Sequence, residues 1–356
     1  MNASPSHQPH PAEWTETQSL QPCVERDLPA GRHQFHKEQL MARIHEDLRT
    51  TTRPEPPRRR PNPFLRRTVL LPAAALALAG AVAGGFALRG GAPDGGTTAL
   101  ATGPALTTTV GAADAKGAPR LLDRISLAAA DTSTPTPREG QYIYIASKVA
   151  STYPRTVGDK TTVVSEELHP RQVWNSLDGK DGWLIERGRT GDEGITLAGE
   201  VGMRGAYDVL ATLPTDPDAL LRRIYRESDA TRDHEVPRDQ AAFVAIGDLL
   251  TESYPPADVS AALYKAAAKI PGVVAVEDAV DATGRHGVAI AREDGTAGER
   301  TEWIFDKKTL RFLGERIVVV KAVEDSPFEV GTVTFTSAIT QRAVVDANKQ
   351  VPGTAS

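Results

Sequence analysis

A run of twenty residues without a charged side chain, from Val69 to Leu88, constrains this chain more than any other feature of its sequence. As a helix it would span about 30 Å, because each residue adds about 1.5 Å, and the hydrocarbon core of a bilayer has about that thickness. The run therefore predicts one transmembrane helix over residues 68–88. Its larger apolar side chains are Val69, Leu70, Leu71, Leu76, Leu78, Val82, Phe86 and Leu88.

Basic residues on one flank of the run predict its orientation. Lys and Arg next to a transmembrane helix stay on the cytoplasmic side. On the other flank, Arg89 is the only basic residue before Lys116. We therefore expect a single-pass, signal-anchor protein of the cell membrane, with a cytoplasmic N-terminus and an extracytoplasmic C-terminal domain. The arginines that set this topology are Arg58, Arg59, Arg60, Arg66 and Arg67.

Two other interpretations of the run are less favoured. A cleaved signal peptide has a short basic segment before an apolar stretch of about 7 to 15 residues, whereas about 68 residues precede this run. A buried helix of a soluble core is the second alternative, because Pro72, Gly80 and Gly84 make the run only moderately hydrophobic. The run has no polar face, however, and it lies between a basic segment and a Gly- and Thr-rich one, which favours the membrane interpretation.

The charge of the chain excludes one class of function. The net charge is −5, and it is unevenly distributed: residues 1–67 have 11 Lys and Arg against 8 Asp and Glu, and the remaining residues have 30 against 38. A nucleic-acid-binding domain needs a basic face, so we expect no nucleic-acid partner for the acidic C-terminal part. The single cysteine, Cys23, also excludes intramolecular disulfides.

The chain divides into five parts. Residues 1–67 form a Pro-rich cytoplasmic tail with one amphipathic helix over 31–50, in which Phe35, Leu40, Ile44 and Leu48 share a stripe. After the span at 68–88, the Gly-, Ala- and Thr-rich residues form a flexible linker. The parts that follow the span are the linker at 89–117, a folded extracytoplasmic domain at 118–346 and a disordered C-terminus at 347–356.

Within the folded domain, strand patterns are interrupted by a group of helical patterns. The predicted fold class is α+β: a curved antiparallel sheet covered by inserted helices, in the manner of a half-barrel. Asp216-Pro217 marks a helix start, and Pro271-Gly272 marks a helix end. We expect helices from 118, from 216, over 240–253 and from 256, and strands over 141–150, 161–177, 183–187, 273–281, 286–292, 299–305, 310–320 and 332–345.

The residue types that carry catalysis or bind metals form no motif in this sequence. Cys23, His33 and His36 lie in the tail without the four-ligand spacing of a structural zinc site. The folded domain has three histidines and no GxSxG nucleophile motif. We therefore expect no enzymatic activity, no metal and no cofactor. The three histidines are His169, His234 and His286.

The acidic residues of the folded domain also indicate no catalytic or metal-binding site. Glu166 and Glu167 are adjacent on a predicted strand, so their side chains point to opposite faces and cannot act on one substrate. The loop from Asp178 to Gly182 resembles part of a calcium-binding loop, but it lacks the later bidentate glutamate. A tight turn between two strands is the favoured interpretation of that loop.

Three tryptophans give the one indication of a binding site. Trp174, Trp183 and Trp303 all fall on predicted strands. On a curved sheet they could line a concave apolar pocket, and we take them as candidate pocket residues. The alternative is that they are ordinary core residues, because aromatic rings on strands are commonly buried.

Several blocks resemble a known family. GQYIYIASK (140–148), LPTDPDALLRRIY (213–225), AALYKAAAKIPGVVAVEDAVDATGRHGVAIAR (261–292) and WIFDKKTLRFLGER (303–316) are similar to a family of uncharacterised actinobacterial single-pass membrane proteins with an extracytoplasmic α+β domain. The resemblance implies the layout described above and no catalytic residues. Genes of this kind are often neighbours of sigma factors, which implies signalling. The order of strands and helices also resembles lipoprotein carriers and periplasmic regulators that bind anti-sigma proteins.

Two functional hypotheses follow. The first is a membrane-anchored, non-enzymatic sensor or regulatory protein, in contact with membrane lipid, that acts on a cytoplasmic partner such as a sigma factor through its inner tail. Its outer domain would bind a lipid, a peptide or a protein ligand. The second is an envelope carrier or scaffold that binds an apolar, lipid-like ligand.

Overall fold

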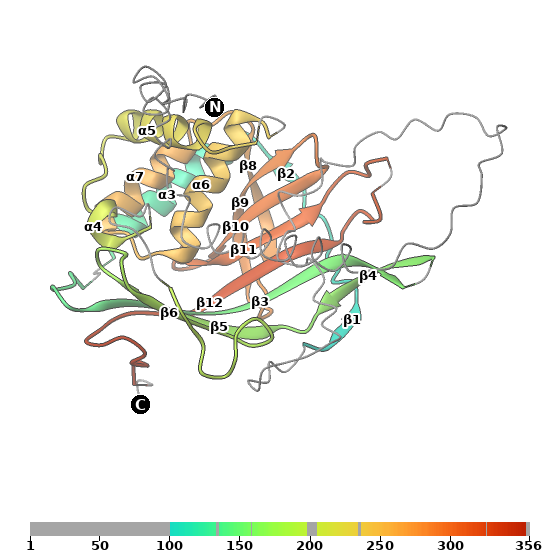
Figure 1. The fold of residues 1–356 in the computed structure, drawn as a ribbon. Coiled ribbons are helices and arrows are strands. Elements are labelled where there is room, and N and C mark those ends of the chain that lie inside the picture. Colours follow the sequence, from blue (N-terminus) through green and yellow to red (C-terminus); the bar gives the residue numbers. More distant parts are fainter. Residues whose placement is uncertain are drawn as a thin grey trace, which may run out of the picture.

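The computed structural model describes residues 100–132, 135–157, 159–197, 205–233, 236–324 and 326–353. Its framework is one sheet of twelve strands, in which every pair of neighbours is antiparallel (Figure 1). The main path of the sheet follows the order β2-β8-β9-β10-β11-β12-β3-β5-β6-β7, and β4 pairs with β3 and β1. Strands β8 to β12 of the second half of the chain thus form one side of the sheet, with the short β2 at its edge, and β12 pairs with β3 of the first half.

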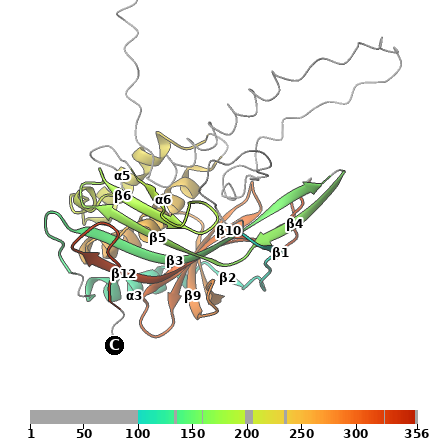
Figure 2. The ribbon, with the colours of Figure 1, turned by 60° about the horizontal axis from the view of Figure 1, so that its bottom comes forward.

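The strands differ widely in length. The long β3 pairs with β12 and β5 through its first part and with β4 through its last part, so β3 and β4 extend together beyond the rest of the sheet (Figure 2). The strands are β1 Thr102–Pro104, β2 Ala113–Asp114, β3 Tyr142–Val157, β4 Lys160–Glu166, β5 His169–Ser176, β6 Gly182–Glu186, β7 Ile195–Thr196, β8 Val273–Val280, β9 His286–Asp294, β10 Glu299–Asp306, β11 Phe312–Val319 and β12 Val333–Val345.

Helices α3, α5 and α7 begin within one residue of their predicted starts, α6 begins two residues before its predicted start, and the short α4 was not predicted. The Asp216 side chain accepts a hydrogen bond from the backbone N–H of Ala219, and Pro217 occupies the first turn of α5. Pro237 and Pro256 directly precede the next two long helices. The helices of the described residues are α3 Ala118–Ala130, α4 Tyr207–Leu210, α5 Pro217–Asp229, α6 Arg238–Glu252 and α7 Ala257–Ala267.

The main hydrophobic core lies between α3, α5, α6 and α7 and one face of β8 to β10, which we call the helix face. Phe243 of α6 stacks on Trp303 of β10 with ring centroids 3.9 Å apart, and Tyr264 of α7 meets Phe305 edge-on at 5.5 Å. Gly247 allows this close approach, because a Cβ there would lie 2.6 Å from Trp303 Nε1. The aromatic stack and the glycine together fix α6 against the sheet.

The opposite face of the sheet carries a buried ionic triad. Glu302 Oε1 lies 2.6 Å from Arg300 Nη2, and Glu302 Oε2 lies 2.6 Å from Arg316 Nε. The N-terminal described segment closes over this triad, because Arg300 donates to the carbonyl O of Gly111 and Arg316 donates to Thr108 Oγ1. Paired and hydrogen-bonded in this way, the three charges are tolerated inside the protein.

The predicted fold class, an α+β half-barrel with a transmembrane helix, is wrong. The structure is mainly β, with twelve strands in one sheet and five helices among the described residues. The sequence indicates one strand over 161–177, but a corner at Glu167-Leu168 separates β4 from β5. It also indicates no strand before Ala118, where β1 and β2 pair with distant strands. Both errors concern pairing between segments far apart in the chain, which a local pattern does not reveal.

The predicted membrane localisation is also contradicted. None of the helices in the described ranges has the length and apolar character that a bilayer crossing requires. The prediction rested on the absence of charged residues from the run at 69–88 rather than on large apolar side chains. Ala and Gly make up much of this run. That run, its flanking arginines, the helix predicted over 31–50 and the first part of the linker lie outside the described residues.

Removing the Phe243 ring tests the core between α6 and the sheet. We expect Phe243→Ala to lower the free energy of unfolding by about 3–5 kcal/mol, because the buried stack on Trp303 is lost and a cavity remains. Urea unfolding followed by circular dichroism measures the change. The control is Leu127→Ala, at a side chain that is 60% exposed, which should change stability by no more than about 0.5 kcal/mol. Equal effects of the two variants would contradict this packing.

Candidate functional site

The three candidate tryptophans do not share a pocket. Across the ladder, Trp303 pairs with Glu315, Glu315 with Ser337, Ser337 with Val149 and Val149 with His169, so these residues lie on one face of the sheet. Trp174 follows His169 by five positions along β5 and therefore lies on the other face. Trp303 belongs to the core under α6, so a pocket lined by all three rings is excluded.

Trp174 and Trp183, by contrast, lie side by side. They face each other across β5 and β6, and Trp174 packs against Tyr144 with ring centroids 5.0 Å apart. Tyr142 joins them from the same strand as Tyr144. We call Tyr142, Tyr144, Trp174 and Trp183 the aromatic shelf. It forms a hydrophobic cluster separate from the core of the helix face.

The C-terminal segment of the described chain covers this shelf. The indole N–H of Trp174 donates to the carbonyl O of Gln350 at 2.7 Å. The ammonium of Lys349 lies 3.3 Å from the centroid of the Trp183 ring, which is a cation–π contact. Asn348 Nδ2 donates to Asp181 Oδ2 at 3.3 Å. We call residues 346–353 the C-terminal turn.

The loop from Asp178 to Gly182 is a turn that supports the shelf. Asp178 accepts hydrogen bonds from the backbone N–H of Lys180 and from the Ser176 hydroxyl. These bonds hold the pKa of Asp178 at about 2. The Tyr142 hydroxyl donates to Asp181 at 2.7 Å, and this hydrogen bond raises the pKa of Tyr142. The acidic side chains of the loop therefore organise the turn and the edge of the shelf.

A second candidate cluster surrounds His169 on the helix face. The Nδ1 atom of His169 lies 3.0 Å from the carbonyl O of Glu167, and its Nε2 lies 3.3 Å from Glu186 Oε1. Arg171 bridges Glu186, at 3.2 Å, to Glu252 at the end of α6, at 2.9 Å. The cluster thus joins β5, β6 and α6 through charges that are far apart in the sequence.

The two buried carboxylates of this cluster have pKa values shifted in opposite directions. Burial raises the pKa of Glu166 above its usual value, although Arg189 pairs with it at 2.5 Å. Burial also opposes the ionisation of Glu186, but the hydrogen bond from His169 and the charge of Arg171 outweigh it and hold the pKa of Glu186 below its usual range. Glu186 is therefore the anionic centre of the cluster.

The geometry of His169 suits a structural role. Both ring nitrogens face acceptors: Nδ1 faces the Glu167 carbonyl O and Nε2 faces the Glu186 carboxylate, so the surrounding residues occupy both polar atoms of the ring. The ring is 1% exposed, so a substrate does not reach it. His286 is on β9, five strand positions and roughly 24 Å away, and it pairs with the exposed Asp278. His234 lies outside the described residues.

Glu299 is a carboxyl group with a raised pKa on the first position of β10. Burial raises its pKa to about 7, although a hydrogen bond from Thr334 at 2.9 Å acts in the other direction. Such values are typical of catalytic acids and bases. Thr334, however, is 1% exposed, so its hydroxyl is closed to a substrate. The raised pKa is therefore explained by burial.

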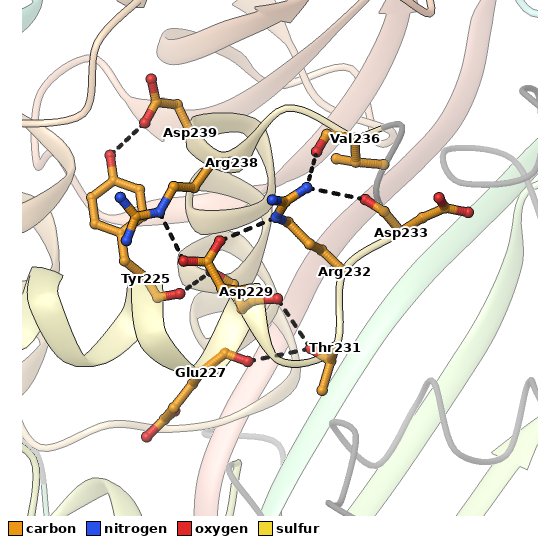
Figure 3. A network of polar contacts seen from close by, with 10 residues as sticks. Tyr225, Glu227, Asp229, Thr231, Arg232, Asp233, Val236, Arg238 and Asp239 are labelled. Atoms are coloured by element: carbon orange, nitrogen blue, oxygen red, sulfur yellow. Dashed lines mark hydrogen bonds and ion pairs between the residues drawn. The ribbon is translucent and has the colours of Figure 1, made fainter.

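A third polar network joins α5 to α6 (Figure 3). Asp229 accepts from Arg232 at 3.1 Å and from Arg238 at 2.8 Å. Tyr225 donates to Asp239 at 2.6 Å, and burial together with this bond raises the pKa of Tyr225 to about 12. The network fastens the end of one helix to the start of the next.

Among the described residues, no group of three or more His, Cys, Asp or Glu side chains is placed to hold a metal ion. Sequence reasoning identified Trp174 and Trp183 but missed their partners in the shelf. A usable signal was present, because Tyr142 and Tyr144 are two apart on a strand and must share a face. No local signal indicates the contact with residues 346–353.

Replacing Glu186 tests the cluster around His169. We expect Glu186→Gln to lower the free energy of unfolding by about 3 kcal/mol at pH 7, because Arg171 loses its buried counter-charge and His169 loses a hydrogen-bond partner. The pKa of Glu186 is lower in the folded state than in the unfolded state. The stabilisation is therefore present at pH values above the pKa of the unfolded state, and it is lost as the pH falls through the pKa of the folded state. Urea unfolding at pH 7 and pH 3 measures both effects. The exposed neighbour provides the control: Glu167→Gln should cost at most about 1 kcal/mol, and an equal cost would contradict the assignment.

Replacing Glu299 should change the free energy of unfolding in the opposite direction. Its pKa is about 7 in the folded state against an ordinary 4.5, so folded protein keeps the proton longer and loses stability as the pH rises between these values. We expect Glu299→Gln to be as stable as the parent at pH 4 and more stable at pH 8, by up to about 3 kcal/mol. Thermal unfolding across this pH range measures the difference, and a parent protein whose advantage grows with pH would refute it.

Comparison with protein-family models finds no match for this chain, and comparison with curated proteins finds none either. The resemblance to a family of actinobacterial membrane proteins therefore stays a prediction. The geometry of the described residues is the basis for a functional proposal.

Proposed function

We propose that the described part of this chain is a non-enzymatic binding domain of a regulatory protein, and that it contacts a protein partner through the aromatic shelf. One observation carries the proposal: the shelf lies outside the main core and is covered by the C-terminal turn through a few polar contacts. A ligand can displace a segment that is held by a few polar contacts, whereas it cannot displace a hydrophobic core.

The composition of the shelf supports this proposal. Tyr and Trp are enriched in protein-binding surfaces, because each offers a large apolar ring together with a hydrogen-bonding group. Trp183 is half-buried, and its indole N–H donates to the carbonyl O of Glu193. The Tyr144 hydroxyl accepts from Gln172. The rings are thus held in fixed positions before a partner arrives, which lowers the entropy cost of binding.

The polar clusters elsewhere support a non-enzymatic role. His169 and Glu186 satisfy each other away from solvent, and Arg171 and Glu252 complete the same network. The near-neutral carboxyl of Glu299 lies beside a buried hydroxyl. The network of His169, Glu186, Arg171 and Glu252 joins elements of the fold, and it lies on the face of the sheet opposite the shelf.

The alternative of an apolar carrier has less support. A carrier of this architecture would hold its ligand between the sheet and the helices. In this protein Phe243 and Trp303 stack there at 3.9 Å, and both are fully buried. The proposed action of residues 1–67 on a sigma factor concerns residues outside the described ranges and stays a prediction.

A binding experiment with matched variants tests the proposed function. The full chain carrying Asn348→Ala and Lys349→Ala, which loosens the C-terminal turn, serves as bait in a host extract. The control bait carries the same two changes plus Trp183→Ala. We expect a protein that the first bait retains and the control bait loses, identified by mass spectrometry. Native mass spectrometry of the same bait then reports any bound lipid.

Each outcome is informative. A partner that depends on Trp183 supports a protein-binding domain. Equal capture by both baits, or no captured protein, contradicts the proposal. A lipid that copurifies in fixed stoichiometry would favour the carrier instead.

A further inference from the structure

The C-terminal turn shows what chemistry the aromatic shelf recognises. It presents three different groups to the shelf: the Gln350 carbonyl O to the Trp174 N–H at 2.7 Å, the Lys349 ammonium to the Trp183 ring at 3.3 Å, and the Asn348 amide to Asp181 at 3.3 Å. A backbone acceptor, a cation and a side-chain donor on three consecutive residues are properties of a polypeptide. A lipid chain offers none of the three.

Charge favours a cationic ligand at this place. Asp178 and Asp181 lie on the turn that joins the two tryptophan-bearing strands. Asp178 pairs with Lys180 of the same turn at 3.1 Å, so Asp181, which accepts from Asn348, is the carboxylate that contacts the C-terminal turn. The ammonium over Trp183 adds an attraction to the negative face of the ring. The surroundings of the shelf thus complement a lysine side chain.

The turn fits the shelf imperfectly. The Asn348 Oδ1 atom is buried without a hydrogen-bond partner among the described residues, and an unsatisfied buried acceptor weakens binding. Lys349 has a φ of 65°, in the left-handed region that disfavours a residue with a side chain. Asp346, Ala347 and Gln350 remain exposed around these contacts. A segment without these two defects would bind the same shelf more tightly.

From these contacts we infer that the aromatic shelf is a recognition site for a lysine-bearing peptide segment of a partner protein, and that the C-terminal turn occupies it as an internal competitor. The inference rests on the proposed function and names both the ligand class and its regulation. The partner segment displaces residues 346–353 and places its own lysine over Trp183. Displacement of the turn leaves the Trp174 N–H without its acceptor. Either the turn or the ligand must therefore supply a new acceptor.

Supplying the turn as a separate peptide tests this inference. The probe is a fluorescein-labelled peptide of residues 346–353, DANKQVPG, and the receptor is the chain shortened after Val345, whose fold is checked by circular dichroism. Fluorescence anisotropy measures binding. We expect saturable binding to the shortened chain and at least about tenfold weaker binding to the full chain, whose own turn has the advantage of a high effective concentration.

Two matched changes isolate the contact with the lysine. A peptide with alanine in place of lysine should bind the shortened chain about three- to fivefold more weakly, and Trp183→Ala in the receptor should weaken the parent peptide by a similar factor. A receptor with Trp303→Phe, on the other face of the sheet, should bind the parent peptide unchanged. Should the shortened chain misfold, the full chain with Asn348→Ala and Lys349→Ala replaces it as receptor.

A folded receptor that does not bind the peptide, a full chain that binds as tightly as the shortened one, or equal binding of the alanine peptide would each overturn the inference. A failure of this inference can be distinguished from a failure of the proposed function. A partner that depends on Trp183, found together with a peptide that does not bind, would leave the binding domain in place and remove only the lysine-bearing ligand class.

Discussion

The structure depends on a sheet that carries buried side chains on both faces, because successive side chains of a strand point to opposite faces and each face of this sheet has its own cover. The helices cover one face, where Phe243 stacks on Trp303 and Gly247 lets α6 approach. The ends of the described chain cover the other. Residues near Thr108 close over the triad centred on Glu302, and residues 346–353 close over the aromatic shelf. The two covers differ in what they contact: the first satisfies buried charges, and the second packs on aromatic rings, of which two are buried and two are half-buried.

Local patterns predicted most of the elements of the folded part. The helix starts at Asp216-Pro217 and before Ala257 are where the sequence places them, because capping and proline chemistry act within a few residues. The four strands from β8 to β11 are also recovered, because short turns separate them. The corner between Glu166 and His169 was missed, since its cause is the pairing of β3 with two different strands.

The candidate site was predictable only in part. That Trp174 and Trp183 share a face follows from their register across a short turn. That Trp303 does not join them depends on a ladder through β11, β12 and β3, whose pairing spans the whole folded part. The pairs that build the second cluster, such as Arg171 with Glu252, connect residues with no periodic relation in sequence. The membrane prediction failed for a related reason, because one local property was taken to define the whole protein.

Strand β5 is bonded to both layers of the molecule. On one face its Arg171 reaches Glu252 at the end of α6, and on the other its Trp174 holds the carbonyl O of Gln350. Arg342 of β12 adds a second tie to the same end of α6 through the Leu250 carbonyl O. Strand β5 is therefore held by contacts on both of its faces. A change in the contacts of residues 346–353 with β5 thus acts on the same strand that holds the end of α6.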